Sequence, residues 1–188
     1  IKNTCEKISW SSPDSFLEAV QSLWFLFLTL HIESMGSSFS PGRIDQYLYP
    51  YYVRDVSNKN LSNEDVVLLL EHLWLKFNEI VLVRGIQETR YFAGFPIGFN
   101  VTIGGQDKYG KDAVNELSFL CLEASKNLRL PQPNLTVRLH KNISEDFLKE
   151  VADTIKLGFG MPQLFNDEIV IPGLLKKGIP IEEARNYA

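Results

Sequence analysis

The sequence predicts an α/β fold, a partial arc of an α/β barrel with long buried helices. From Pro96 onward, segments of strand periodicity alternate with segments of helical periodicity, in the order strand, helix, strand, helix, short strand or loop, helix. This alternation is typical of parallel strands with helices outside them. Two or three strands cannot close a barrel and would leave an unpaired edge, so we expect the 188 residues to form an arc of a larger one.

The composition suits one globular domain. Hydrophobic residues make up 45% of the chain and charged residues 22%, unlike a disordered sequence. The net charge of -4 and the scattered Lys and Arg offer no basic field to phosphate backbones, so we expect no nucleic-acid partner. The two cysteines, Cys5 and Cys121, have no spacing that suits zinc, and this usage indicates a reducing, cytoplasmic location.

The first long helix is predicted over residues 13–34. Ser12 is its expected N-cap, Pro13 takes the first helical position, and the helix is apolar nearly all round, so we expect it to be buried on most sides. Its most apolar run, Ala19–Ile32, has fourteen residues by its numbering, short of the roughly twenty that a bilayer-spanning helix needs. The run therefore predicts a buried core helix, and no membrane partner is expected.

The stretch SFSPGRIDQYLYPYY, residues 38–52, lies between two helical segments. Its prolines and glycine exclude a continuous helix. We interpret the part from Arg43 to Tyr52 as scaffold, a buried loop and helix start in which Arg43 and Asp45 tie the loop together. Its tyrosines are expected to seal the core: Tyr47, Tyr49, Tyr51 and Tyr52.

Three elements follow. Ser62 and Asp65 stand in capping-box positions and begin a helix expected to run to about Val83. Residues 96–105, PIGFNVTIGG, are rich in β-branched and aromatic residues and end in a glycine pair, which predicts a strand that leaves into a tight turn. Helical periodicity returns over 111–127, where Cys121 is expected to be a packed core thiol.

The next strand contains the candidate cavity residues Arg138 and His140. In LPQPNLTVRLH, Leu135, Val137 and Leu139 are predicted to point to one face of a strand, and Thr136, Arg138 and His140 to the other. Inward-facing side chains of a barrel meet ligands, so Arg138 and His140 are possible cavity-facing residues, although strand ends also use Arg and His in plain salt bridges. His31 and His72 are expected to be packing residues on helices.

The last part of the chain contains two adjacent acids, Asp167 and Glu168. Ser144 caps a helix that Gly158 ends, and residues 163–178 supply a short loop and a short helix. Neighbouring acids do not face each other, so we favour Asn166 and Asp167 as a helix cap over an acid/base pair. Nucleotide, metalloprotease and serine-hydrolase motifs are missing from the sequence, and we expect no metal site.

Four runs of the sequence resemble consecutive landmarks of the glycyl radical enzymes, in the branch of pyruvate formate-lyase and glycerol dehydratase. They occur in the expected order within the part of the chain from Ser37 to the end: SPGRIDQYLYPYY, GGQDKYGKDAVNELSFLCLEA, LPQPNLTVRLHKN and FNDEIVIPGLLKKGIPIEEARNYA. The resemblance implies a ten-stranded α/β barrel built from two antiparallel halves of five parallel strands. Residues 1–188 would then be part of a single pyruvate formate-lyase-type (PFL) domain.

The resemblance also implies a mechanism. A radical stored on a backbone glycine moves to a cysteine at the barrel centre, and the resulting thiyl abstracts hydrogen from the substrate. In this family the cysteine lies in a G-C-V-E motif soon after A-R-x-Y; here ARNYA ends at Ala188. Neither Cys5 nor Cys121 matches the motif, so we expect the catalytic cysteine and the radical glycine beyond these residues, and no catalytic residue within them.

The resemblance implies a dehydratase or lyase that acts on a small polar substrate. The alternative enzyme is a formate acetyltransferase. A third possibility is a protein that is not an enzyme, namely a non-catalytic remnant of the barrel. Glycerol dehydratase has a substrate-contacting His-Ser pair where this chain has Ser37 and Ser38, so these two are the expected substrate-binding residues. The missing histidine argues against glycerol itself. The implied partner is a radical-SAM activating enzyme with an iron–sulfur cluster, which installs the glycyl radical. We expect residues 1–188 to bind no cofactor, and we expect the whole protein to be a homodimer.

Overall fold

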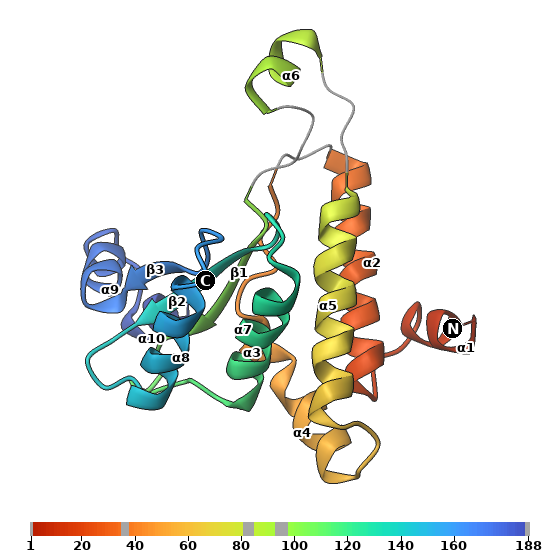
Figure 1. Cartoon of the computed structure of the whole chain (residues 1–188), viewed down its shortest axis with the longest axis horizontal. Helices are drawn as coiled ribbons and strands as arrows, with labels where there is room; N and C mark the ends of the chain where they lie inside the picture. The colour runs from red at the N-terminus through yellow and green to blue at the C-terminus, as the bar shows by residue number, and fades with distance from the viewer. Residues whose placement is uncertain (1, 35–37, 81–84, 93–97, 187–188) are drawn as a thin grey trace.

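A three-stranded parallel sheet forms the centre of the α/β half of the molecule (Figure 1). The computed structural model describes residues 2–34, 38–80, 85–92 and 98–186. The strands are β1 (Asn100–Gly104), β2 (Asn134–Leu139) and β3 (Gln163–Asn166), paired in that order. Along the other edge of β1, the chain at Gly42 adds one parallel bridge to Val101. The predicted parallel arrangement is confirmed.

Helices surround this sheet and extend the molecule to one side (Figure 1). They are α1 (Lys2–Ile8), α2 (Phe16–Ser34), α3 (Ile44–Tyr47), α4 (Tyr49–Ser57), α5 (Asn63–Glu79), α6 (Ile86–Phe92), α7 (Glu116–Leu128), α8 (Glu145–Ile155), α9 (Asp167–Lys176) and α10 (Ile181–Asn186). The sequence did not predict α1 or α6. The part from Arg43 to Tyr52, expected to be a loop and the start of a helix, is helical from Ile44 and is broken into two short helices at Leu48.

The prediction for α2 was wrong in two respects. The helix begins at Phe16 rather than Pro13, because the Phe16 N–H donates to Asp55 Oδ2 at 2.7 Å and the Glu18 N–H donates to Ser15 Oγ at 3.2 Å. It is also half exposed: Phe16, Ala19, Val20, Phe27 and His31 are buried, whereas other large residues face outward, among them Phe25, Leu26, Leu30 and Ile32. By length and composition alone, this 19-residue helix could cross a membrane, a property that core helices of soluble proteins share.

Helices α2 and α5 lie side by side (Figure 1) and share an aromatic core. The rings of Phe27 and Phe77 have centroids 4.7 Å apart. The predicted capping box is confirmed, with the Asp65 N–H donating to Ser62 Oγ at 3.2 Å and the Ser62 N–H to Asp65 Oδ2 at 2.9 Å. The helix ends at Glu79, before the predicted Val83, which lies outside the described residues.

The two faces of the sheet differ as the alternation of β2 predicts. On the outer face, Leu135 and Val137 join the hydrophobic core beside Val101 and Ile103, with which they are in register. Helices α7 and α8 cover this face, and α7 ties to α5 through a hydrogen bond from Trp74 Nε1 to Ser125 Oγ. The predicted burial of Cys121 in α7 is confirmed. The other face, which we call the inner face, carries polar side chains.

Helix α7 starts five residues later than predicted. Residues 106–112 form a turn closed by a bridge between Gln106 and Asp112, and Asn115 then caps the helix by accepting a hydrogen bond from the Ser118 N–H. The predicted cap of α8 is confirmed, since Ser144 Oγ accepts from the Phe147 N–H. Local turn chemistry, which hydrophobic periodicity does not report, moved the first boundary.

Candidate functional site

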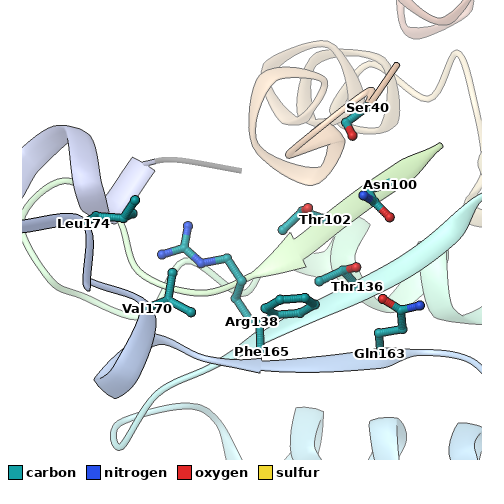
Figure 2. Close-up of a pocket in the computed structure, with 9 residues that line it drawn as sticks. All are labelled: Ser40, Asn100, Thr102, Thr136, Arg138, Gln163, Phe165, Val170 and Leu174. Atoms are coloured by element: carbon teal, nitrogen blue, oxygen red, sulfur yellow. The ribbon is translucent and has the colours of Figure 1, made fainter. Parts of the chain in front are cut away.

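A cavity of about 290 Å³ lies on the inner face of the sheet (Figure 2). We call it the inner-face cavity. Thr102, Thr136 and Gln163 lie in one row across the three strands, because Thr102 is in register with Thr136 and Thr136 with Gln163. The remaining lining residues are Ser40, Asn100, Arg138, Phe165, Val170 and Leu174. Hydroxyl, amide and guanidinium groups therefore face an otherwise apolar space, a combination that suits a small hydroxylated molecule.

Ser38 is not one of the residues that line this cavity, but it lies close to it in sequence. Ser40, two residues further on, lines it, as does Asn100, two residues after Gly98. Gly98 has φ +87, and a Cβ at this glycine would lie 3.5 Å from Ser38 Cβ, so the two segments approach closely there. Ser38 is exposed, and Ser37 lies outside the described residues. The substrate contact expected of both serines stays a prediction.

Arg138 lines the inner-face cavity and pairs with Asp167 at its far end. Arg138 Nε donates to Asp167 Oδ1 at 2.7 Å, and the two residues are 4% and 1% exposed. Asn166 is the helix cap that the sequence predicted, accepting from the Glu168 N–H at 2.9 Å. Asp167 is the first residue of α9 and the ion-pair partner of Arg138 rather than the cap. An acid directly after the third strand was the available signal, because parallel strand ends meet at one edge of a sheet.

The side chains of Arg43 and Asp45 bond to the end of β1, to α7 and to α10, so they do more than tie their own loop together as expected. Asp45 Oδ2 accepts from the Gly104 N–H at 2.8 Å and from Ser118 Oγ at 2.6 Å. Arg43 Nη2 donates to the Gly104 carbonyl at 2.9 Å. Burial raises the pKa of Asp45, because the low-dielectric interior disfavours the carboxylate. These two residues fix where β1 ends.

The four tyrosines after Arg43 behave differently from one another. Tyr52 is buried as predicted, and Tyr49 and Tyr51 pack partly against the core. Tyr47 is exposed instead, with its hydroxyl donating to the Pro41 carbonyl. The Tyr49 hydroxyl donates to Glu116 at 2.6 Å, and this bond is the main reason that the pKa of Tyr49 rises to about 12. Most of this stretch is scaffold.

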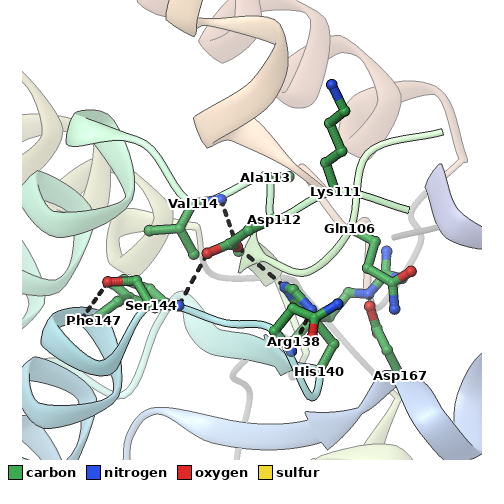
Figure 3. A network of polar contacts seen from close by, with 12 residues as sticks. Gln106, Lys111, Asp112, Ala113, Val114, Arg138, His140, Ser144, Phe147 and Asp167 are labelled. Carbon is green, nitrogen blue, oxygen red and sulfur yellow. Dashed lines mark hydrogen bonds and ion pairs between the residues drawn. The ribbon is translucent and has the colours of Figure 1, made fainter. Parts of the chain in front are cut away.

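His140 takes part in a polar network outside the inner-face cavity (Figure 3). The Asn142 N–H donates to His140 Nδ1 at 3.3 Å, so the neutral ring carries its proton on Nε2 and donates it to Asp112 Oδ1 at 3.1 Å. Asp112 Oδ2 in turn accepts from the Ser144 N–H at 3.0 Å. The ring also lines a second, more polar cavity of about 410 Å³ between the strand ends, α9 and α10. A ligand role for Arg138 or His140 stays a prediction.

The other titratable groups named from the sequence lie apart from this cavity. His31 is buried and its Nδ1 bonds to the Phe27 carbonyl at 2.8 Å, as expected of a packing residue, whereas His72 is exposed on α5, contrary to expectation. Burial raises the pKa of the Cys121 thiol well above its ordinary value, which keeps it protonated and unreactive. Within the described residues, no cluster of three or more His, Cys, Asp or Glu could hold a metal ion.

Comparison with known proteins places this geometry in a family. The family model described as pyruvate formate lyase-like matches residues 1–188. The chain belongs to this family. The probable dehydratase YbiW of Escherichia coli K12 is 47% identical over 98% of this chain, and the (2S)-3-sulfopropanediol dehydratase of Klebsiella oxytoca is 37% identical over 97%. The chain spans 23% and 22% of the lengths of these two proteins.

Solved structures of family members superpose closely on this chain. A structure of 1,2-propanediol dehydration in Roseburia inulinivorans gives a TM-score of 0.94 at 40% identity, over 98% of this chain and 23% of that one. The glycerol-bound, B12-independent glycerol dehydratase of Clostridium butyricum gives 0.92 at 41% identity, over 97% and 23%. The resemblance to the glycyl radical enzymes and the partial-barrel fold that it implied are therefore confirmed.

Proposed function

We propose that this chain is part of a glycyl radical dehydratase or lyase that acts on a small polar substrate. The observation that carries the proposal is the 47% identity to a probable dehydratase, together with the match of the family model over residues 1–188. Further relatives include isethionate sulfite-lyases and a trans-4-hydroxy-L-proline dehydratase. Elimination of a small group, water or sulfite, is the chemistry that these names share.

The inner-face cavity supports this proposal by its chemistry. We assign the substrate hydroxyls to the part of the cavity that Ser40 and Asn100 line, with Ser38 and Ser37 as the further contacts that the resemblance implies. Arg138 also lines the cavity and would favour a polar substituent of the substrate. Apolar side chains of α9 would exclude water, which would otherwise quench a carbon radical.

The reaction itself would use groups that lie beyond residue 188. A glycyl radical in the whole protein would generate a thiyl on a cysteine that follows ARNYA, and the thiyl would take a hydrogen atom from the substrate before the neighbouring group leaves. We further propose that a radical-SAM activating enzyme with an iron–sulfur cluster installs the glycyl radical, and that the whole protein is a cytoplasmic homodimer with one pyruvate formate-lyase-type domain containing residues 1–188.

Two alternatives lead to different observations. A formate acetyltransferase would convert pyruvate and coenzyme A, and it is less supported because the relatives named above are dehydratases and lyases. A non-catalytic remnant would lack the cysteine after ARNYA. Sequencing the codons that follow Ala188 separates the remnant from both enzymes.

The functional test is anaerobic incubation of the full-length protein with its activating enzyme and S-adenosylmethionine. We expect a glycyl doublet in the electron paramagnetic resonance spectrum. We then expect turnover of one compound from a panel of glycerol, 1,2-propanediol, (2S)-3-sulfopropanediol, isethionate and trans-4-hydroxy-L-proline. A spectrum without the doublet, from a protein that the activating enzyme demonstrably binds, would overturn the proposal, and turnover of pyruvate alone would favour the acetyltransferase.

A further inference from the structure

The C-terminal end of α10 is bonded to two buried arginines from distant parts of the chain. Arg138 Nη1 donates to the carbonyl oxygen of Arg185 at 2.9 Å, and Arg43 Nη1 donates to the same oxygen at 3.3 Å. Arg43 Nη1 also donates to Asn186 Oδ1 at 3.2 Å. The last carbonyl groups of a helix have no partner within it, and the helix dipole favours cations there. The two guanidinium groups thus fix the point at which the chain leaves α10.

The same two arginines also hold the end of β1 and the wall of the inner-face cavity. Arg43 donates to the carbonyl groups of Gly104 at 2.9 Å and Gln106 at 3.0 Å. Arg138 lines the cavity beside Thr102 and Thr136, and its guanidinium extends toward α9 (Figure 2). A shift of the end of α10 would therefore require both arginine side chains to move. Movement of Arg138 would in turn move the wall of the cavity.

Stability alone does not account for this arrangement. Arg43 and Arg138 are 5% and 4% exposed, and the charge of Arg138 adds to the effect of burial in lowering the pKa of Arg43. The buried Asp45 and Asp167 balance these two cations. Apolar residues in place of buried ionic groups are often neutral or stabilising, so a cluster of four buried charges is better explained by the geometry it imposes. A guanidinium offers a rigid fork that can bond several carbonyl groups at once.

We propose that Arg43 and Arg138 are positioning residues that hold the C-terminal end of α10 at a fixed place relative to the wall of the inner-face cavity. The effect on catalysis rests on the proposed function, in which this cavity holds the substrate. Arg43 does not line the cavity and acts through the Arg185 carbonyl oxygen, to which Arg138 also donates. It is therefore the better residue to test, because its loss removes no direct substrate contact.

The test is Arg43→Lys in the full-length protein, which keeps the charge but cannot bridge the carbonyl groups of Gly104 and Arg185 together. We expect amide hydrogen exchange in α10 to accelerate by roughly tenfold or more, since hydrogen bonds to a charged group are lost. We expect kcat to fall by about tenfold, with KM for the substrate and the yield of glycyl radical close to those of the unmodified protein. Arg54→Lys, at an exposed arginine on α4, is the matched control and should change none of these.

The milder variant Asn186→Ala removes one acceptor of Arg43 at an exposed position, so it remains informative where Arg43→Lys fails to fold. It should accelerate exchange in α10 by about threefold. Unchanged exchange in α10 in the folded variants would overturn the proposal. Faster exchange with unchanged kcat would reduce the two arginines to a structural role and overturn the positioning claim. If the unmodified protein forms no glycyl radical, the proposed function fails, whereas the exchange measurement still decides whether Arg43 holds α10.

Discussion

Gly105→Ala tests how closely the turn after β1 presses on Arg138. Gly105 has φ +78, and a Cβ there would lie 3.0 Å from both Arg138 Cβ and Arg138 Nε. An L-residue at positive φ costs about 1–2 kcal/mol. Overpacking a buried site adds about 1–3 kcal/mol, so the free energy of unfolding should fall by about 2–5 kcal/mol in total. Because Arg138 lines the inner-face cavity, KM for the substrate should also rise.

Gly178→Ala is the matched control. Gly178 has φ +85 and nothing within 4 Å of its would-be Cβ, so this variant carries the backbone strain without the contact. Its cost should be about 1–2 kcal/mol, with KM unchanged. Equilibrium urea denaturation and steady-state kinetics of the full-length variants measure both effects. Equal stabilities and equal KM values for the two variants would refute the claim that Gly105 leaves space for Arg138.

Three further predictions concern single residues. Ser38→Ala should raise KM or abolish turnover without unfolding the protein, because one hydroxyl at an exposed position is lost; full activity would remove Ser38 from the substrate site. Asp45→Asn should change the pH dependence of stability, because burial raises the pKa of Asp45 in the folded protein. The stabilising contribution of Asp45 is complete below its pKa in the unfolded chain, 3.8, and is lost as the pH rises through its pKa in the folded protein. The stability of the unmodified protein relative to Asp45→Asn should therefore decline with rising pH, and a rising difference in urea titrations would contradict the assignment. Cys121→Ala should cost about 1–2 kcal/mol as a core truncation and leave radical yield and turnover intact; loss of turnover in a folded variant would give this buried thiol a role in the reaction.

Local patterns in the sequence predicted those elements that depend on neighbours in the chain. Three predicted features depend on residues within a few positions of one another. They are the capping box at Ser62, the alternation of Leu135 and Thr136 across β2, and the helix cap at Asn166. Hydrophobic periodicity was a poorer guide for α2, whose exposed side carries Leu26 and Leu30. An apolar helix face can pack against other parts of this chain or remain exposed. Hydrophobic periodicity does not distinguish a packed face from an exposed one.

The candidate site was only partly predictable. The strand pattern predicts the place of Arg138 but not its partner, and the helix-cap pattern does not indicate that the Asp167 carboxylate bonds to Arg138. The two are 29 positions apart in sequence. Helix periodicity and strand alternation relate residues of the same helix or strand. They do not indicate which residue at the end of a neighbouring strand contacts a given side chain.

By itself, the sequence determined that this chain is an α/β arc of the pyruvate formate lyase-like family, because long ordered motifs and the alternation of strands and helices are properties of the linear order. Only the tertiary structure decided that Arg43 and Arg138 meet at the carbonyl oxygen of Arg185, 142 and 47 positions away. The physical reason is that buried hydrogen-bond donors and acceptors need partners, and the folded structure determines which groups are near one another. Every residue has a backbone carbonyl group, so the residue type does not show which carbonyl accepts from a buried arginine.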